Sequence, residues 1–292
     1  MVRDSRYVTN TAYSGAESLV ISRFRCTTQE RYLNITHQGY QTFLYGGTEG
    51  PSMYSDEFVL AATTNDLTHE PLVRDAADIL EFRMDKARDP ITQLSEYDGD
   101  LSIIATNRAQ WFGGQAQDTG RLDYLFAASR FNAVETVDIE LETARGSGWM
   151  IPEFRENDVE IIISFHVFED TPDQETLSAI FDQCTDYGDI GKIAAYAEDY
   201  ADALKMLKAV HTATREGKRV AGISMGGFGS HTRIVAPLYG SKLGYAPLKT
   251  DKKEYAPGQI SIHELSSMIK VLSITDQQAT KLPSIDSVPS ET

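Results

Sequence analysis

Residues 159–172 read VEIIISFHVFEDTP, and this stretch decides the fold class. Its first seven residues are dominated by isoleucine and valine and are followed by a polar loop. A short run that is apolar on both faces is typical of a buried strand in a parallel sheet. Seven further runs rich in Val, Ile and Ala have this character, at residues 59–64, 78–84, 101–106, 134–141, 192–197, 219–225 and 242–248.

Amphipathic segments separate these runs and predict helices. The segment 200–217 carries apolar residues at helical spacing and ends on Gly217, a typical helix C-cap. A last helix is predicted over 261–272, where Ser261 and Glu264 form a capping box. Eight strands alternating with helices over residues 58–272 predict an α/β fold, a (β/α)8 TIM barrel that forms a catalytic domain. An open doubly wound sheet is the alternative, but no GxGxxG motif follows the first strand.

The two flanks differ from the barrel segment. Residues 1–57 are polar, rich in Thr, Tyr and Gly, and lack a sustained period. We therefore expect an N-terminal extension that does not belong to the barrel, and the sequence leaves its structure open. Residues 273–292 have the composition of a disordered tail.

Charge is the main compositional signal in the 292 residues. Asp and Glu number 43 against 27 Lys and Arg, which gives a net charge of −16. Nucleic acids and anionic membranes are polyanions, so neither is an expected partner. The acidic surface predicts adaptation to a salt-rich cytoplasm, with an ordinary acidic enzyme as the alternative. No long apolar segment predicts a membrane span or signal peptide, and two cysteines are too few for a disulfide framework.

Active sites of TIM barrels lie at the carboxyl ends of the strands. This rule selects polar residues that end or follow the predicted strands, namely Glu81, Arg83, Arg108, His166, Lys192, Arg233 and Gln259. Burial and neighbouring arginines would disfavour the charged form of Lys192 and leave a nucleophilic amine. The alternative is a lysine that extends from the rim of the barrel into solvent.

His166 precedes Lys192 by one strand, so the two side chains are expected to be neighbours. A histidine there can accept and return a proton, although a purely structural role is the alternative. The arginines indicate an anionic, hydroxylated ligand. Glu81 would balance their charge or form a salt bridge with one of them. No spacing typical of a metal site occurs.

The glycine-rich run SMGGFGSHTR, at 224–233, follows the seventh strand. Such a loop can hold a phosphate in a TIM barrel. The other interpretation is a turn that supports a lid and places Arg233, and it is the one predicted once the resemblance given below is considered, because the substrate that the resemblance implies carries no phosphate.

Six motifs stand in an order that resembles type I 3-dehydroquinate dehydratases of the shikimate pathway, and archaeal salt-adapted members most. They are ILEFRMD (79–85), TNRAQWFGGQ (106–115), SFHVFEDTP (164–172), GKIAAYAED (191–199), ISMGGFGSHTR (223–233) and YAPGQIS (255–261). The resemblance covers residues 58–272. It implies a (β/α)8 barrel, a homodimer that acts in aromatic amino acid biosynthesis, and no metal or cofactor. The cytoplasmic location is expected because no segment predicts a signal peptide or membrane span.

The resemblance also implies a role for each matching residue. Lys192 matches the lysine that forms an imine, or Schiff base, with the substrate ketone. His166 matches the general base that removes the neighbouring proton and later protonates the departing hydroxyl. The remaining matches are substrate-binding: Arg233 and Gln259 for the carboxylate, Glu81, Arg83 and Arg108 for the ring hydroxyls, and Met225 for the ring face.

Three positions depart from the family pattern. The family usually has a glutamate at Phe112, Asp or Asn at Val167, and Ser or Thr at Tyr255, which lies in the substrate-binding motif near Gln259. The predicted function is conversion of 3-dehydroquinate to 3-dehydroshikimate and water. The alternatives are another Schiff-base lyase, such as a sugar-phosphate aldolase, and a catalytically decayed barrel that serves as an interaction module.

Overall fold

A computed structural model describes residues 53–54, 57–248 and 259–279, with side chains up to 272 in the last range, and five short strands before residue 50. The chain divides into two compact units, Met1–Gly50 and Pro51–Thr292. The first unit contains two small antiparallel sheets. One pairs β1 (Tyr13–Ser14) with β2 (Glu17–Ser18), and the other has the order β3 (Ile21–Ser22), β4 (Asn34–His37) and β5 (Tyr40–Phe43).

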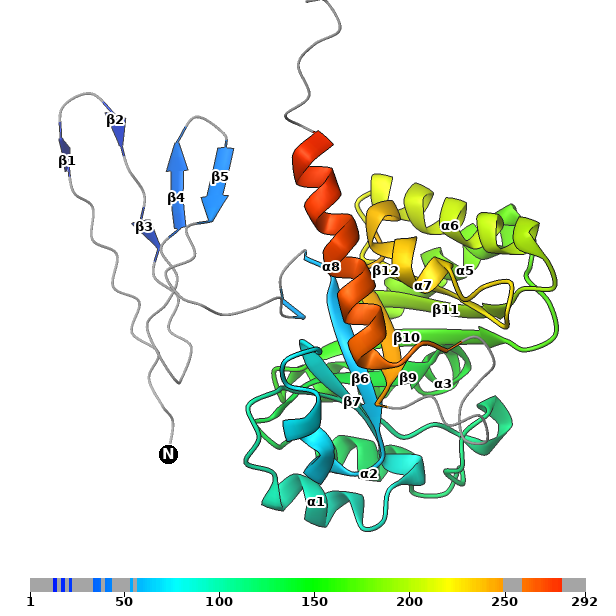
Figure 1. The fold of residues 1–292 in the computed structure, drawn as a ribbon. Helices are drawn as coiled ribbons and strands as arrows, with labels where there is room; N and C mark the ends of the chain where they lie inside the picture. Colours follow the sequence, from blue (N-terminus) through cyan, green and yellow to red (C-terminus); the bar gives the residue numbers. More distant parts are fainter. Residues whose placement is uncertain are drawn as a thin grey trace, which may run out of the picture. The chain divides into compact units, whose positions relative to one another are not determined.

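The second unit is the predicted (β/α)8 barrel (Figure 1). Its strands are β6 (Val59–Thr64), β7 (Ile79–Arg83), β8 (Ile103–Thr106), β9 (Val134–Glu140), β10 (Glu160–Val167), β11 (Ile190–Tyr196), β12 (Val220–Met225) and β13 (Leu243–Pro247). All neighbours pair in parallel, in chain order, and β13 returns to pair with β6. This order excludes the open doubly wound sheet.

The last gap of the barrel is bridged at one end by main-chain hydrogen bonds through Lys242. Its amide donates to the carbonyl of Val220 over 2.7 Å, and its carbonyl accepts from the amide of Val59 over 2.9 Å. Lys242, the residue before β13, thus connects the amino ends of β12 and β6. The carboxyl ends of the strands lie at the other end of the barrel, where the cavity opens.

Helices surround the strands, as Figure 1 shows. The α-helices are α1 (Pro90–Glu96), α2 (Arg121–Ala128), α3 (Leu141–Ser147), α4 (Ile151–Arg155), α5 (Gln174–Tyr187), α6 (Tyr200–Arg215), α7 (Thr232–Val235) and α8 (Ile262–Ala279). Short 3-10 turns are η1 (Leu67–Leu72), η2 (Met84–Lys86), η3 (Gln110–Phe112), η4 (Gly148–Met150) and η5 (Ala236–Tyr239). None of the described helices is long and apolar enough to cross a membrane.

The helix boundaries follow from local chemistry. The side chain of Asp199 accepts a hydrogen bond from the amide of Asp202 and caps α6, which ends before Gly217 in a left-handed conformation, φ 84°. Half of the predicted capping box is present at α8: the carboxylate of Glu264 accepts from the amide of Ser261, and it also accepts from the hydroxyl of Ser261. That helix continues to Ala279, past its predicted end at 272. The division of the chain at 57 and 272 stays a prediction.

Alternation along each strand separates two apolar layers. On β10, Ile161 and Ile163 pack outward under the helices, whereas Ile162 belongs to the cluster inside the barrel. The same alternation carries on to the end of the strand, where Val167 packs with the outer layer and His166 lines the interior cavity. A strand of this fold therefore presents every second residue to the site.

Candidate active site

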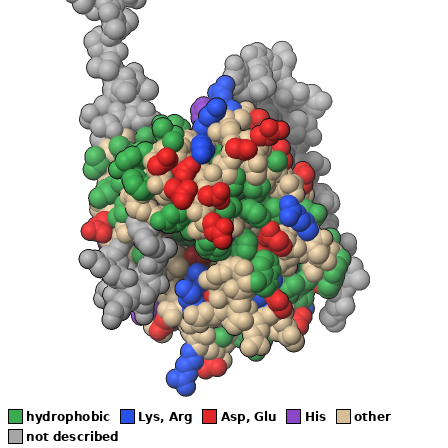
Figure 2. All heavy atoms as spheres, turned by 90° about the vertical axis from the view of Figure 1, so that its right-hand side faces the viewer, with side chains coloured by type: hydrophobic (Ala, Val, Ile, Leu, Met, Phe, Trp, Pro, Cys, Tyr) green, Lys and Arg blue, Asp and Glu red, His purple; other side chains and the backbone are tan. Residues whose placement is uncertain are grey.

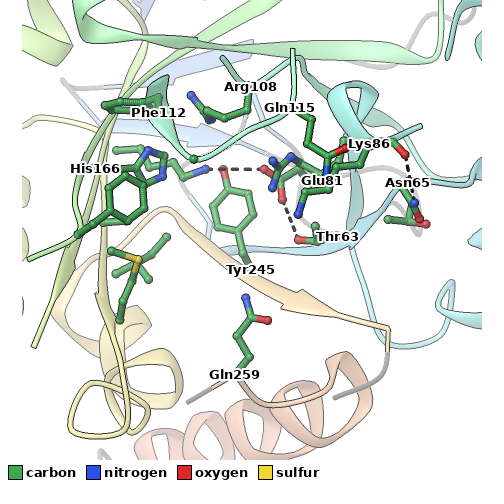
Figure 3. Close-up of a pocket in the computed structure, with 18 of the residues that line it drawn as sticks. Thr63, Asn65, Glu81, Lys86, Arg108, Phe112, Gln115, His166, Tyr245 and Gln259 are labelled. Atoms are coloured by element: carbon green, nitrogen blue, oxygen red, sulfur yellow. Dashed lines mark hydrogen bonds and ion pairs between the residues drawn. The ribbon is translucent and has the colours of Figure 1, made fainter. Parts of the chain in front are cut away.

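One cavity of about 660 Å³ opens at the carboxyl ends of the strands (Figure 3). Eight of the nine predicted site residues line it: Glu81, Arg83, Arg108, His166, Lys192, Met225, Arg233 and Gln259. The ninth, Tyr255, lies outside the described residues. Phe112 also lines the cavity, whereas Val167 points away from it, so the departure from the family pattern at Val167 falls outside the cavity wall.

Lys192 ends inside the barrel. Its side chain is 5% exposed, and its ammonium lies 3.0 Å from Oδ2 of Asp138 and 3.8 Å from Oε1 of Glu81. The aromatic ring of Tyr245 lies 3.9 Å from Nζ. The buried position rules out a lysine that extends into solvent. The sequence interpretation of a lysine among arginines missed the two carboxylates that face it.

Asp138 is the centre of a buried ion-pair cluster. Its Oδ1 accepts from Arg108 over 2.6 Å and from the hydroxyl of Ser164 over 2.6 Å, while Oδ2 accepts from Lys192. Burial alone would raise the pKa of this carboxyl group, but the charges of Arg108 and Lys192 and the bond from Ser164 hold its pKa well below the usual range. Asp138 is therefore ionised and orients both cations.

Sequence reasoning missed Asp138 and its neighbour on the same strand face, Glu140. The signal was present in residues 136–141, TVDIEL, where polar residues alternate with apolar ones. Val137 and Ile139 pack outward, so Thr136, Asp138 and Glu140 point into the barrel. Polar residues on the inner face of a barrel strand mark a site.

His166 lies on β10, beside β11, the strand that carries Lys192. Its ring stacks on Phe168, with centroids 5.8 Å apart and an interplanar angle of 16°, and meets Phe112 edge-on. Burial lowers the pKa of His166 well below its ordinary value, and the positive charges of Arg108 and Lys192 lower it further. Its Nδ1 finds no hydrogen-bond partner among the described residues. The imidazole is consequently neutral and able to accept a proton.

Glu81 and Arg83 extend from β7 into the same cavity. The carboxylate of Glu81 accepts from the hydroxyl of Thr63 over 2.7 Å, as Figure 3 shows, and from that of Thr106 over 3.3 Å. Arg83 forms two 2.8 Å bonds with Asp85. The sequence analysis considered a salt bridge between Glu81 and an arginine. Among the described residues, the ion-pair partner of Glu81 is instead Lys192.

Arg233 and Gln259 present polar atoms without partners. Nη1 of Arg233 donates to the carbonyl of Tyr245 over 3.0 Å, but Nε is buried and unpaired among the described residues, as is Oε1 of Gln259. Burial lowers the pKa of Arg233 to about 10. A buried cation with no carboxylate beside it is stabilised when an anion enters the cavity.

The glycine-rich loop is a compact turn. Several of its amides already donate to loop carbonyls: Gly229 to Gly226, Ser230 to Gly227, and Arg233 to Ser230. Gly226 has φ 85°, and a Cβ on Gly229 would lie 2.3 Å from the carbonyl oxygen of Ser224. These glycines serve tight packing, and their engaged amides favour a turn that places Arg233 over a phosphate cradle.

Within the described part of the chain, no group of three His, Cys, Asp or Glu side chains could hold a metal ion. The cavity instead brings together the side-chain nitrogen of Lys192, the neutral imidazole of His166 and three arginines, Arg83, Arg108 and Arg233. Such a set can form an imine with a ketone and move a proton next to it.

Comparison with known proteins agrees with this chemistry. Residues 60–276 match the family model of type I 3-dehydroquinase. The 3-dehydroquinate dehydratase of Haloarcula marismortui is 43% identical over 220 residues, which cover 73% of this chain and 96% of that protein. The enzyme of the same name from Halobacterium salinarum is 41% identical over 224 residues, covering 74% and 98%.

A solved structure shares the fold. The crystal structure of 3-dehydroquinate dehydratase from Geobacillus kaustophilus HTA426 superimposes with a TM-score of 0.66 and 28% identity, over 75% of this chain and 92% of that one. The family model spans most of the chain, and the two curated relatives are covered almost completely. The chain therefore belongs to the type I 3-dehydroquinase family.

Proposed function

We propose that this protein dehydrates 3-dehydroquinate to 3-dehydroshikimate and water through an imine on Lys192, with His166 as general base and general acid. The observation that carries the proposal is the pairing of a buried lysine with a neutral histidine from the next strand in one cavity. Family membership supports the overall reaction, and the geometry supports the roles of the two residues.

Binding places the substrate between two groups of residues. Arg233 and Gln259, which have unpaired buried atoms, hold the carboxylate, while Glu81, Arg83 and Arg108 hold the ring hydroxyls. Met225 and the aromatic residues of the wall cover the ring face. The ketone carbon then lies at Nζ of Lys192. The ammonium gives up one proton, the resulting amine attacks the carbon, and that proton is used again as water departs, so that ammonium and ketone give the protonated imine and one water.

Elimination follows from the protonated imine. His166 removes a proton from the carbon next to the imine carbon, and the electron pair moves toward the positive nitrogen to give an enamine. The enamine expels the hydroxyl group two bonds away as His166 returns the proton, so a water molecule departs. Hydrolysis of the conjugated imine consumes one water and releases the enone and Lys192. The balance is one substrate giving one product and one water.

The test is direct. Purified protein in molar potassium chloride is incubated with 3-dehydroquinate, and the ultraviolet absorbance of the conjugated enone is followed. Borohydride added during turnover reduces an imine to a stable amine, so mass spectrometry of the digested protein is expected to find the adduct on Lys192. Labelling at another lysine would remove Lys192 from its role.

The same assay addresses the two other candidates. A sugar-phosphate aldolase would be inhibited by inorganic phosphate and would give no enone. A decayed barrel would give neither enone nor adduct. The homodimer, the cytoplasmic location and the absence of a cofactor stay predictions, for which light scattering, cell fractionation and dialysis against a chelator are the measurements.

A further inference from the structure

Arg121 is a buried arginine outside the cavity. It is the first residue of α2, is 4% exposed and does not line the cavity. Its Nη1 donates to Oε2 of Glu140 over 2.8 Å and to the carbonyl of Asn107 over 3.3 Å, while Nη2 donates to the hydroxyl of Thr143 over 2.9 Å. The side-chain amide of Asn107 returns a bond to the carbonyl of Arg121. The guanidinium is therefore held from three sides.

Glu140 connects this arginine to the cavity wall. Its side chain has no exposed surface, and its second oxygen accepts from Nη1 of Arg108 over 3.2 Å and from the amide of Ala109 over 3.3 Å. A fully buried carboxylate is stable only when cations and donors surround it. Arg121 supplies one of its two cations, and Arg108 supplies the other.

Arg108 passes the constraint to the predicted nucleophile. Its Nη2 bonds Asp138, whose other oxygen accepts from Lys192, and Lys192 lies 3.8 Å from Glu81. Cations and carboxylates thus alternate along one chain of contacts: Arg121, Glu140, Arg108, Asp138, Lys192 and Glu81. Three positive and three negative groups balance, and each inner member touches two of opposite sign.

We propose that Arg121 is a positioning residue for the reaction: it fixes Glu140 and, through it, the orientation of Arg108, Asp138 and Lys192. This inference rests on the proposed function. Nothing in it requires Arg121 to touch substrate. Its guanidinium keeps Glu140 from drawing Arg108 away from Asp138, because a carboxylate with one cation left attracts that cation more closely.

The test compares Arg121→Met with Arg121→Lys. Arg121→Met removes the charge, so Arg108 shifts toward Glu140 and kcat falls by about 10- to 100-fold, the cost expected for displacement of a reacting group by a fraction of an ångström to one ångström. Arg121→Lys keeps the charge, but one shorter ammonium cannot occupy the positions of both Nη atoms, so its hold on Glu140 is weaker and its kcat falls less than in Arg121→Met. KM is expected to rise less than kcat falls, because Arg233 and Gln259, which hold the carboxylate, form no ion pair with this chain of contacts in the described part of the structure, whereas the shift of Arg108 weakens one contact to a ring hydroxyl.

Borohydride separates positioning from folding. With saturating substrate, the fraction of chains that carry the borohydride adduct on Lys192 measures the fraction of sites that can form the imine. Dividing kcat by that fraction gives the turnover of each competent site. A purely structural role would lower the trapped fraction or the melting temperature and leave kcat per competent site unchanged. Should Arg121→Met fail to fold, the charge-conserving Arg121→Lys decides. Arg130→Lys is the matched control, since Arg130 is exposed and lies over Phe126 at the end of the same helix.

A double variant tests the route. If Arg121 acts through Asp138, the combination Arg121→Lys with Asp138→Asn loses less kcat than the product of the two single losses, because independent sites would multiply. An unchanged kcat per competent site in both Arg121 variants, or losses that multiply, would overturn the proposal. An inactive wild-type protein that borohydride cannot trap would instead overturn the proposed function.

Discussion

The imidazole of His166 meets the ring of Phe112 edge-on, with centroids 4.7 Å apart and an interplanar angle of 67° (Figure 3). The guanidinium of Arg108 lies 5.7 Å from the same ring. Phe112, where the resemblance predicts a glutamate, is thus in contact with the predicted base. The ring of Phe112 covers one side of the imidazole with hydrocarbon, and this burial contributes to the neutral state of His166.

Phe112→Glu is expected to raise kcat with little change in KM. A carboxylate beside His166 stabilises the imidazolium and raises a pKa that burial, Arg108 and Lys192 now hold well below its ordinary value. A base whose pKa lies closer to the working pH transfers protons more effectively. Since the base must be neutral, the acidic limb of kcat/KM moves to higher pH. Trp111→Glu adds the same charge on the neighbouring, half-exposed residue and is expected to leave that limb in place.

His166→Ala is expected to lower kcat by about 10² to 10⁴, the usual contribution of a general acid–base group. Imine formation needs no imidazole, so borohydride still traps Lys192 in this variant. In the wild-type protein the lowered pKa of His166 keeps the ring neutral below about pH 6.5, the ordinary value, and kcat/KM stays high there. A near-normal rate in the variant would assign the proton transfer to another residue.

The strands were the most predictable part of this molecule. Every predicted run contains most of a barrel strand, because a segment buried on both faces leaves a continuous apolar signal. Because the carboxyl ends of barrel strands meet on one face, His166 and Lys192 were predicted to be neighbours, and both line the same cavity. The strand to which a residue belongs, and its position along that strand, can be predicted from the sequence of that segment alone.

The partners inside the site were not predictable in this way. The carboxylate that faces Lys192 is Asp138, which lies two strands away, on β9, with β10 between it and β11. Such a contact depends on the stagger of the sheet and on the inward slope of the side chains, which local sequence does not give. The pairing of Arg83 with Asp85 rather than Glu81 depends on the turn at η2. Likewise the short antiparallel strands before residue 50 lie in a polar stretch without a period, so their pairing left no local signal.

Asp138→Asn is expected to destabilise the protein by roughly 3 to 5 kcal/mol, because it leaves Arg108 and Lys192 buried with one charge partner fewer each. Urea denaturation measures this loss. The same variant loses kcat, because the amide no longer holds Lys192 as a carboxylate does. Asp123→Asn, at an exposed position of α2, is the matched control and is expected to unfold at the wild-type urea concentration.

Salt is expected to stabilise the protein through its surface. Carboxylates are spread over the face in Figure 2, with fewer Lys and Arg among them, and the whole chain carries a net charge of −16. Raising potassium chloride from about 0.1 M to 1 M shortens the screening length from about 10 Å to about 3 Å and relieves this repulsion. The melting temperature and activity are expected to rise over that range.

Two comparisons assign such a rise to screening of surface charge. An uncharged osmolyte at equal water activity strengthens burial without screening charge, so it should give a smaller rise than potassium chloride. The buried pairs of Asp138 are little screened, so the stability lost in Asp138→Asn should be nearly the same at low and molar salt. A melting temperature independent of potassium chloride would show that self-repulsion of the acidic surface does not limit stability, and the predicted salt adaptation would then be wrong.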